Sequence, residues 1–510
     1  MRVLYLDIDT LRPDHLGCYG YHRATSPNID RLAAGGVRFD NCYVSDAPCL
    51  PSRAAMFTGQ FGIHTGVVNH GGLAADIRPV GRYRRFETAR QRPGFIECLR
   101  HAGLHAVSVS PFAERHSAWW FCAGWNEMYN TGSRGMESAE QVTPAALDWL
   151  ARHAREDNWL LHVNYWDPHT PFRAPPEFGE PFADQPPPAW YTEELRRRHW
   201  DSFGPHSAQE PMGNFGRPNS DRWPRMPDRI ASLGDYKRWI DGYDTGIRYA
   251  DEHCGRILSA LADAGVLDDT LVIVTSDHGE NQGELGIYGD HQTADHVTSR
   301  VPMILRLPSG GTGFQPVQVA PGGTGFQPVQ VAGPRVDDAL HYQSDVAATL
   351  VELLGEPVPE HWDGRSFADA FRAGQARGRD YLVLSQMAWS CQRAVRWGDH
   401  VFIRTWHTGL KDLPERMLFD VRRDGHELND LADARTALAD HGQALLEKWT
   451  SDMLARGDGA DPLWTVMAEG GPYHDRECRS AYLEHLRRTG RAHHADFLAA
   501  CPTGLSTQRP

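Results

Sequence analysis

Residues 47–59 read APCLPSRAAMFTG. We interpret the other motifs of the chain as parts of one site that is built around this stretch. Pro51 suits the first turn of a helix, where no backbone donor is needed, and the pattern predicts a short helix over residues 52–58. Cys49 is then expected just ahead of the helix N-terminus, where the dipole and the free N–H groups favour an anion. Arg53 can reach back toward the side chain at position 49. A buried structural cysteine is the alternative interpretation.

Residues 2–9, RVLYLDID, predict a buried parallel strand that ends in two acids, Asp7 and Asp9. Alternation along the strand places both side chains on the same side. Ligands of open α/β sheets bind at this end of the strands. Because the two carboxylates repel each other, a divalent cation between them is the favoured interpretation. A helix-capping aspartate is the alternative.

A second buried strand, residues 270–276, ends in Asp277 and His278 and is followed by Gly279 and Glu280. An acid and a histidine at the mouth of this strand could form a split metal site together with Asp9. The two carboxylates are hard ligands, and the histidine adds a nitrogen. This donor set suits Ca²⁺ or Mg²⁺, with Mn²⁺ as a further alternative.

Five segments occur in the order found in the type I sulfatases, a family that the chain resembles from about residue 2 to residue 450. They are the entry strand with Gly-Cys-Tyr-Gly at 17–20, the Cys-x-Pro-x-Arg string at 49–53, Pro-His-x-Pro at 168–171, Asp-His at 277–278 and Arg-Val-Pro at 300–302. The resemblance implies an α/β fold of the alkaline-phosphatase type. In that fold, helices sandwich a mainly parallel sheet, and a small C-terminal antiparallel α+β subdomain follows.

The resemblance also implies a sulfuric ester hydrolase with a modified residue at position 49. In the family this cysteine is oxidised to formylglycine by a formylglycine-generating enzyme, and the hydrated aldehyde attacks sulfur. The metal, most often calcium, would be held by Asp9, Cys49 after its modification, Asp277 and His278. Most members carry a second acid next to the first, where this chain has Thr10. Asp7 is therefore the candidate for the missing carboxylate.

The residues expected around the sulfate match the family only in part. Arg53 matches the position that offsets charge on the sulfate oxygens, and His169 matches the one that protonates the leaving group. The family lysine of the loop at 110–116 is absent, so Arg115 and His116 are the candidates there. His291 is the candidate that replaces a second lysine.

Asn69 and His70 lie in a glycine-flanked loop, residues 62–72, that could fold over the nucleophile. A polar turn is the alternative interpretation, because glycine and asparagine both favour turns. If the loop covers position 49, Asn69 would contact the substrate.

The change of pattern along the chain predicts three parts: a catalytic α/β domain at 1–377, a C-terminal subdomain at 378–455 and a C-terminal tail at 456–510. Residues 173–228 are expected to form an irregular excursion that shapes the substrate cleft. An 11-residue repeat, residues 310–320 copied at 322–332, predicts a surface insertion at 309–333.

The composition of this 510-residue chain excludes some classes of binding partner. A formal net charge of −14 argues against nucleic acid and against a membrane surface, and no stretch approaches the roughly 20 apolar residues of a membrane span. The N-terminus has no signal-peptide pattern, which predicts a cytoplasmic protein unless the true start lies upstream. Nine cysteines without regular spacing favour a reduced compartment.

Several functions remain open from the sequence. A sulfated saccharide or a small sulfate ester is the expected substrate class. A phosphonate monoester or phosphodiester hydrolase of the same superfamily is one alternative, because a fold does not determine a substrate. A catalytically inactive sulfatase-like binding protein is another. A cysteine hydrolase is disfavoured, since no Cys-His-Asn/Asp pattern stands out. The pattern does not determine the oligomeric state.

Overall fold

The computed structural model describes residues 1–78, 92–213, 222–308 and 335–501. The insertion predicted at 309–333 lies outside these residues. Among the helices within them, no segment combines the length and the apolar character needed to cross a membrane.

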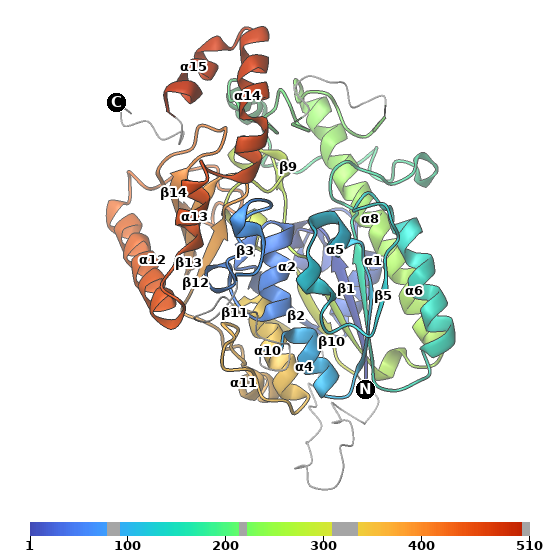
Figure 1. The fold of residues 1–510 in the computed structure, drawn as a ribbon. Coiled ribbons are helices and arrows are strands. Elements are labelled where there is room, and N and C mark those ends of the chain that lie inside the picture. The colour runs from blue at the N-terminus through green and yellow to red at the C-terminus, as the bar shows by residue number, and fades with distance from the viewer. Residues whose placement is uncertain (79–91, 214–221, 309–334, 502–510) are drawn as a thin grey trace.

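A sheet of eight strands forms the centre of the molecule (Figure 1). In chain order the strands are β1 (Arg2–Ile8), β2 (Val37–Tyr43), β4 (His105–Val109), β5 (Glu127–Tyr129), β6 (Trp159–Tyr165), β7 (Thr270–Thr275), β10 (Met303–Arg306) and β11 (Arg335–Tyr342). Their spatial order is β11-β2-β10-β7-β1-β6-β4-β5. All neighbours are parallel except at β10, which runs antiparallel to β2 and β7. The sheet is therefore mainly parallel, as predicted.

Helices cover both faces of this sheet (Figure 1). One face packs against α1 (Pro27–Ala34), α6 (Ala139–His153) and α8 (Leu233–Asp263), and the other packs against α2 (Cys49–Thr58), α4 (Phe95–His101) and α10 (Gln343–Leu353). Strand alternation sends Leu4 and Leu6 into the first core and Val3 and Tyr5 into the second. Asp7 continues the second series, so its side chain points toward the face that α2 covers.

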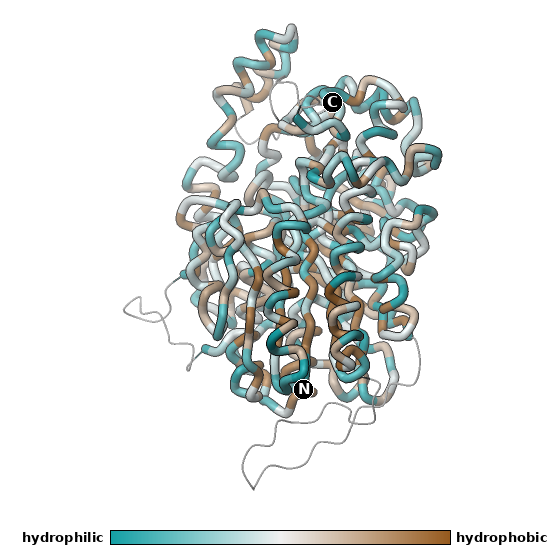
Figure 2. Tube along the Cα trace, turned by 90° about the vertical axis from the view of Figure 1, so that its right-hand side faces the viewer, coloured by the Kyte–Doolittle hydropathy of each residue, from teal (hydrophilic) through white to brown (hydrophobic). Residues whose placement is uncertain are grey.

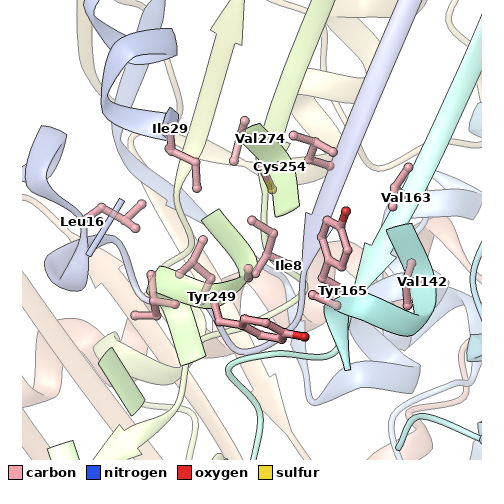
Figure 3. Packing of buried hydrophobic residues seen from close by; sticks show 14 of the residues in the cluster. Ile8, Leu16, Ile29, Val142, Val163, Tyr165, Tyr249, Cys254 and Val274 are labelled. Atoms are coloured by element: carbon pink, nitrogen blue, oxygen red, sulfur yellow. The ribbon is translucent and has the colours of Figure 1, made fainter. Parts of the chain in front are cut away.

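The first core is continuous from the sheet to its covering helices. Figure 3 shows Ile8 of β1 and Val163 of β6 in one cluster with Val142 of α6 and Tyr249 and Cys254 of α8. In Figure 2 the hydrophobic residues gather on the central strands and on the helices beside them. This apolar packing fixes the strand ends that carry the polar residues described below.

Short elements complete the part of the chain around the large sheet. They are the helices α3 (Gly62–Thr65), α5 (Phe112–His116), α7 (Glu193–Trp200), α9 (His296–Ser299) and α11 (Ala368–Arg372), with the hairpin of β8 (Asn281–Gln282) and β9 (Tyr288–Asp290). Helix α7 lies in the segment expected to be irregular. Thr192 starts it by accepting a hydrogen bond from the N–H of Leu195, a local signal that apolar periodicity does not reveal.

A second sheet has five strands in the order β15-β14-β13-β12-β3. These strands are β3 (Asp46–Ala47), β12 (Tyr381–Gln386), β13 (Cys391–Trp397), β14 (His400–His407) and β15 (Arg416–Asp420), and α12 (Thr436–Arg456) packs on them. The four C-terminal strands are antiparallel, as predicted. The chain enters this sheet as β3 directly before Cys49, so the smaller sheet also anchors the start of α2.

The C-terminal tail is helical, with α13 (Pro462–Ala468), α14 (Tyr473–Arg488) and α15 (Ala492–Ala500). Leu410, in the loop after β14, packs with Tyr482 and Leu486 of α14 and with Leu498 of α15. The tail therefore folds onto the body of the chain.

Helix α2 begins three residues earlier than the sequence pattern predicts. Cys49 is its first residue, and the N–H of Ser52 donates to the carbonyl of Pro48 at 2.9 Å. Pro51 is compatible with this start because the first turn of a helix needs no N–H donor from it. Cys49 thus lies in the first turn rather than ahead of it.

Candidate active site

Arg53 connects the ends of the two central strands. Its Nε donates to Asp7 at 2.9 Å, and its Nη1 donates to Asp9 at 3.2 Å and to Asp277 at 2.5 Å. All four side chains are buried. Burial of an ion pair is favourable only when its charges are compensated and bonded, and here one guanidinium faces three carboxylates. The cluster therefore carries excess negative charge.

Four side chains of this region present atoms that could hold one metal ion. One ligand atom each from Asp9, Cys49, Asp277 and His278 lies within 4.8 Å of every other. The second carboxylate oxygen of Asp9 has no hydrogen-bond partner within the described part of the chain, although it is buried. Excess negative charge together with an unpartnered oxygen is the setting that a divalent cation neutralises, so the residues present fit such an ion.

The imidazole of His278 is oriented by the backbone of the next residue. Its Nδ1 lies 2.7 Å from the carbonyl of Gly279, which can only accept, so Nδ1 carries the proton. The lone pair is then on Nε2, which lies 3.1 Å from Sγ of Cys49. A histidine whose other ring nitrogen is held in this way is a typical metal ligand.

The electrostatic environment disfavours a thiolate at position 49. Burial, together with Asp9 and Asp277, raises the pKa of Cys49 well above its ordinary value, although Arg53 opposes the shift. Burial and Asp9 also raise the pKa of Asp277 to about 6. A nucleophilic thiolate needs the opposite setting, so this site does not suit cysteine hydrolase chemistry.

His169 and His291 lie close to Cys49. Their ring nitrogens and Sγ lie within 4.8 Å of one another. Burial and Arg115 lower the pKa of His169 to about 3. Burial and His278 lower the pKa of His291 well below its ordinary value. Both imidazole rings are therefore neutral at neutral pH, until a negatively charged group binds beside them.

Several nitrogen donors of this region have no partner among the described residues. They are Arg53 Nη2, Asn69 Nδ2, His70 Nε2, Arg115 Nε, His116 Nε2 and His291 Nδ1, and all are buried atoms. Arg53 and Arg115 lie 5.7 and 4.8 Å from the Trp166 ring, and His70 and His116 lie 5.0 Å apart. Unpartnered buried donors are rare in folded proteins, and a group of them is suited to an anion with several acceptor oxygens.

The C-terminal tail orders part of this donor group. The side-chain oxygen of Asn69 accepts from the N–H of His70 at 2.9 Å and from the N–H of Tyr473 at 3.3 Å, which leaves Nδ2 of Asn69 free. His474 of α14 lies 2.9 Å from His70 through their ring nitrogens and stacks on Trp389 at 4.4 Å. The tail thus lies beside the site.

The structure brings together most of the residues that the sequence singled out. Asp7 is the exception: it falls outside the four-atom cluster, because Arg53 and His162 occupy its carboxylate at 2.9 and 3.5 Å. Burial raises its pKa, but Arg53 and His162 lower it more, so it is ionised. Asp7 therefore lies where it can hold Arg53.

Two site residues carried no predicted role: Glu280 and His474. Glu280 lies inside a motif that was recognised, so position alone could have marked it. His474 lies 404 residues after His70 in the sequence, and no local pattern predicts a contact between residues so far apart.

A family model described as Sulfatase matches residues 2–356. Among curated relatives, the uncharacterized sulfatase YidJ of Escherichia coli (strain K12) is 27% identical over 333 residues, which are 60% of this chain and 63% of that protein. Iduronate 2-sulfatase of Mus musculus is 27% identical over 422 residues, 74% of this chain and 72% of the relative. The chain thus spans somewhat less than two thirds of the first relative's length.

Solved structures share the fold. BT4656, solved in complex with its substrate D-glucosamine-2-N,6-O-disulfate, superposes with a TM-score of 0.69 at 18% identity and covers 91% of this chain and 99% of that one. Phosphonate monoester hydrolase of Agrobacterium radiobacter gives a TM-score of 0.65 at 20% identity, over 89% and 96% of the two chains. At these identities the likeness shows the alkaline-phosphatase-like fold and not the substrate.

Proposed function

Because the chain belongs to the sulfatase family of the alkaline phosphatase superfamily, we propose that it hydrolyses a sulfate ester through formylglycine made from Cys49. The observation that carries this proposal is the position of Cys49. Its Sγ belongs to the four-atom cluster that fits a divalent cation and also lies within 4.8 Å of ring nitrogens of His169 and His291. A formylglycine-generating enzyme is the partner that the modification requires.

The proposed cation is Ca²⁺, with Mg²⁺ or Mn²⁺ as alternatives, held by Asp9, Asp277, His278 and the modified residue 49. When bound, the cation would supply Lewis-acid polarisation of the sulfate, and the aldehyde hydrate would supply the nucleophile. Asp7 holds Arg53 through Nε, and the unpartnered Nη2 of Arg53 is proposed to contact the anion. The proposed role of Asp7 is therefore to position Arg53 rather than to bind the metal.

The remaining residues are proposed to bind the sulfate and move a proton. Asn69, Arg115, His116 and His291 would bind the oxygens of the sulfate. His169 would give a proton to the leaving oxygen. Because its pKa is about 3 without substrate, His169 needs the negative charge of a bound sulfate to raise that pKa before it can carry the proton.

A sulfated saccharide is the proposed substrate class. Two comparisons support it: BT4656 was solved with a sulfated glucosamine, and the mouse relative is an iduronate 2-sulfatase. The test is a panel of sulfated mono- and disaccharides and an aryl sulfate, with release of free sulfate as the readout. We expect turnover of at least one saccharide sulfate above the aryl sulfate.

A phosphonate monoester hydrolase is the second candidate, because one of the reported structures has that activity. An aryl phosphonate monoester therefore belongs in the same panel. A kcat/KM for the phosphonate above that of every sulfate ester would contradict the proposed substrate class. It would leave the nucleophile and the cation intact.

Arg115 gives a direct test of the anion site. We expect Arg115→Met to lower kcat/KM for the sulfate ester by about 10- to 100-fold, since a hydrogen bond to a charged group contributes roughly 1.5–3 kcal/mol. Methionine keeps much of the packing on Trp166 while it removes the unpartnered Nε.

Two controls separate charge from packing at this position. Arg115→Lys keeps the charge and should lose less than Arg115→Met. Arg31→Met, on the exposed side of α1, should leave kcat/KM unchanged. Equal kcat/KM for Arg115→Met and the wild type would remove Arg115 from the substrate site.

A further inference from the structure

His474 is a residue of the C-terminal tail that contacts the donor group of the active site. Its Nε2 lies 2.9 Å from Nδ1 of His70. Its ring stacks on Trp389 at 4.4 Å with 24° between the two planes, and its backbone N–H donates to the carbonyl of Ala388 at 3.1 Å. The imidazole of His474 is therefore held in place by contacts that do not involve His70.

The tail also packs closely against the loop that carries His70. A Cβ atom at Gly71 would lie 2.3 Å from the Tyr473 ring, and a Cβ atom at Gly72 would lie 2.3 Å from the Glu469 carboxylate. Glu469 also accepts from the N–H of Leu73 at 2.8 Å. Only glycine allows an approach this close, so the loop has little freedom to move relative to the tail.

Nε2 of His70 is a buried nitrogen without a hydrogen-bond partner among the described residues. The ring of His70 lies 5.0 Å from that of His116, whose Nε2 is also unpartnered. The His116 ring is 5.2 Å from Phe112, and the guanidinium of Arg53 lies 5.0 Å from the same Phe112 ring. His70 thus belongs to the donors around the proposed anion, although the function proposed above gives it no role.

The contact between His70 and His474 holds one proton. Burial lowers the pKa of His70 well below its ordinary value and also lowers the pKa of His474, so both imidazoles are neutral and each carries one ring proton. Nδ1 of His474 lies 3.7 Å from the Glu477 carboxylate, which is longer than a hydrogen bond, so Glu477 does not fix the proton of His474 on Nδ1. When Nε2 of His474 donates, Nδ1 of His70 accepts, and the proton of His70 is then on Nε2.

We propose that His70 donates a hydrogen bond from Nε2 to the substrate anion, and that His474 is the positioning residue that fixes this tautomer. In the opposite arrangement a lone pair of His70 would face the anion and repel it. The proposal rests on the proposed function, because it requires an anion beside His70 and His116. It makes the C-terminal tail a part of the substrate site.

His474→Phe tests the positioning role. Phenylalanine keeps a ring that can stack on Trp389 and removes the nitrogen that contacts His70. We expect the Kd of inorganic sulfate, measured by isothermal titration calorimetry on the full chain with Ca²⁺ present, to rise about 3- to 10-fold, the effect of losing one hydrogen bond. KM for the sulfate ester should rise by a similar factor while kcat stays within about twofold, because the contact acts equally on bound substrate and transition state.

Two further variants separate the hydrogen bond from packing. The side-chain amide of His474→Gln can donate near the place of Nε2, so this variant should keep the Kd of sulfate within about threefold of the wild type. His493 is an exposed histidine of α15 in the same tail and gives the matched control. His493→Phe should leave the Kd, KM and melting temperature unchanged.

A double-variant cycle tests whether His474 acts through His70. His70→Phe should raise the Kd of sulfate about 10- to 100-fold, because a hydrogen bond to a charged group is lost. In that background, His474→Phe should have no further effect, since the residue that it positions is absent.

The outcomes distinguish this inference from the proposed function. A wild-type chain that neither hydrolyses a sulfate ester nor binds inorganic sulfate overturns both. Hydrolysis by the wild type, with the same Kd and KM in His474→Phe, overturns the inference alone. The inference is also overturned if the effect of His474→Phe persists in full in the His70→Phe background, or if kcat and the melting temperature fall while KM does not change. Raised Kd and KM at unchanged kcat, with recovery in His474→Gln and no added effect in the double variant, support it.

Discussion

Cys49→Ala is expected to lower the rate of sulfate ester hydrolysis by about 10⁴-fold or more, the scale on which enzymes lose activity when their nucleophile is removed. Cys49 is 2% exposed and begins α2, where alanine is compatible with the helix, so the fold should persist. The measurement is sulfate release at saturating substrate, with far-UV circular dichroism and the melting temperature as checks on folding.

The exposed Cys122 provides the matched control. Cys122→Ala should keep full activity, because that thiol lies at the surface. Mass spectrometry of the peptide that contains residue 49 should show conversion of the thiol to the aldehyde in active wild-type protein. Activity of Cys49→Ala within about tenfold of the wild type would refute a nucleophile at this position.

Arg53→Met is expected to destabilise the metal-free protein by about 3–5 kcal/mol, the usual effect of removing one partner from a buried ion pair. Arg53 bonds Asp7, Asp9 and Asp277 at once, so methionine leaves three buried carboxylates without their cation. Urea unfolding measures the free energy. Added Ca²⁺ should recover part of the loss, because a bound cation supplies positive charge to two of these acids.

An exposed ion pair serves as the control for this stability effect. Arg152 pairs with Asp148 at 2.9 Å on the surface of α6, and Arg152→Met should change the free energy of unfolding by less than about 1 kcal/mol. If metal-free Arg53→Met is as stable as the wild type, the three carboxylates do not depend on Arg53 for compensation.

The sequence predicted the parts of the fold that have strong local patterns. Residues 2–9 and 270–276 read as buried strands that end in acids, and they became β1 and β7, which pair in parallel. The alternating segments after residue 378 became the antiparallel strands β12 to β15. Local patterns were weaker at helix starts, where Cys49 proved to begin α2 and Thr192 proved to begin α7 with its side chain.

Asp7 shows why spacing along a strand does not assign a role. Its alternation with Asp9 correctly placed both side chains on the same side of the chain. Their contacts differ, however. The carboxylate of Asp7 is bound by Arg53 and His162, while one carboxylate oxygen of Asp9 has no partner among the described residues. Only packing between strands β1 and β6 brings His162 to Asp7, and the sequence of residues 2–9 contains no sign of it.

By itself the sequence determined which residue types are available at the strand ends, because buried strands, their terminal acids and the Cys-x-Pro-x-Arg string are local patterns. The tertiary structure alone decided which of those side chains form ion pairs and which have atoms without a hydrogen-bond partner. His70 and His474 gained their places from a contact between segments that lie 404 residues apart in the sequence. Such contacts depend on how the sheet, the excursion and the tail pack together, and a short-range pattern cannot encode them.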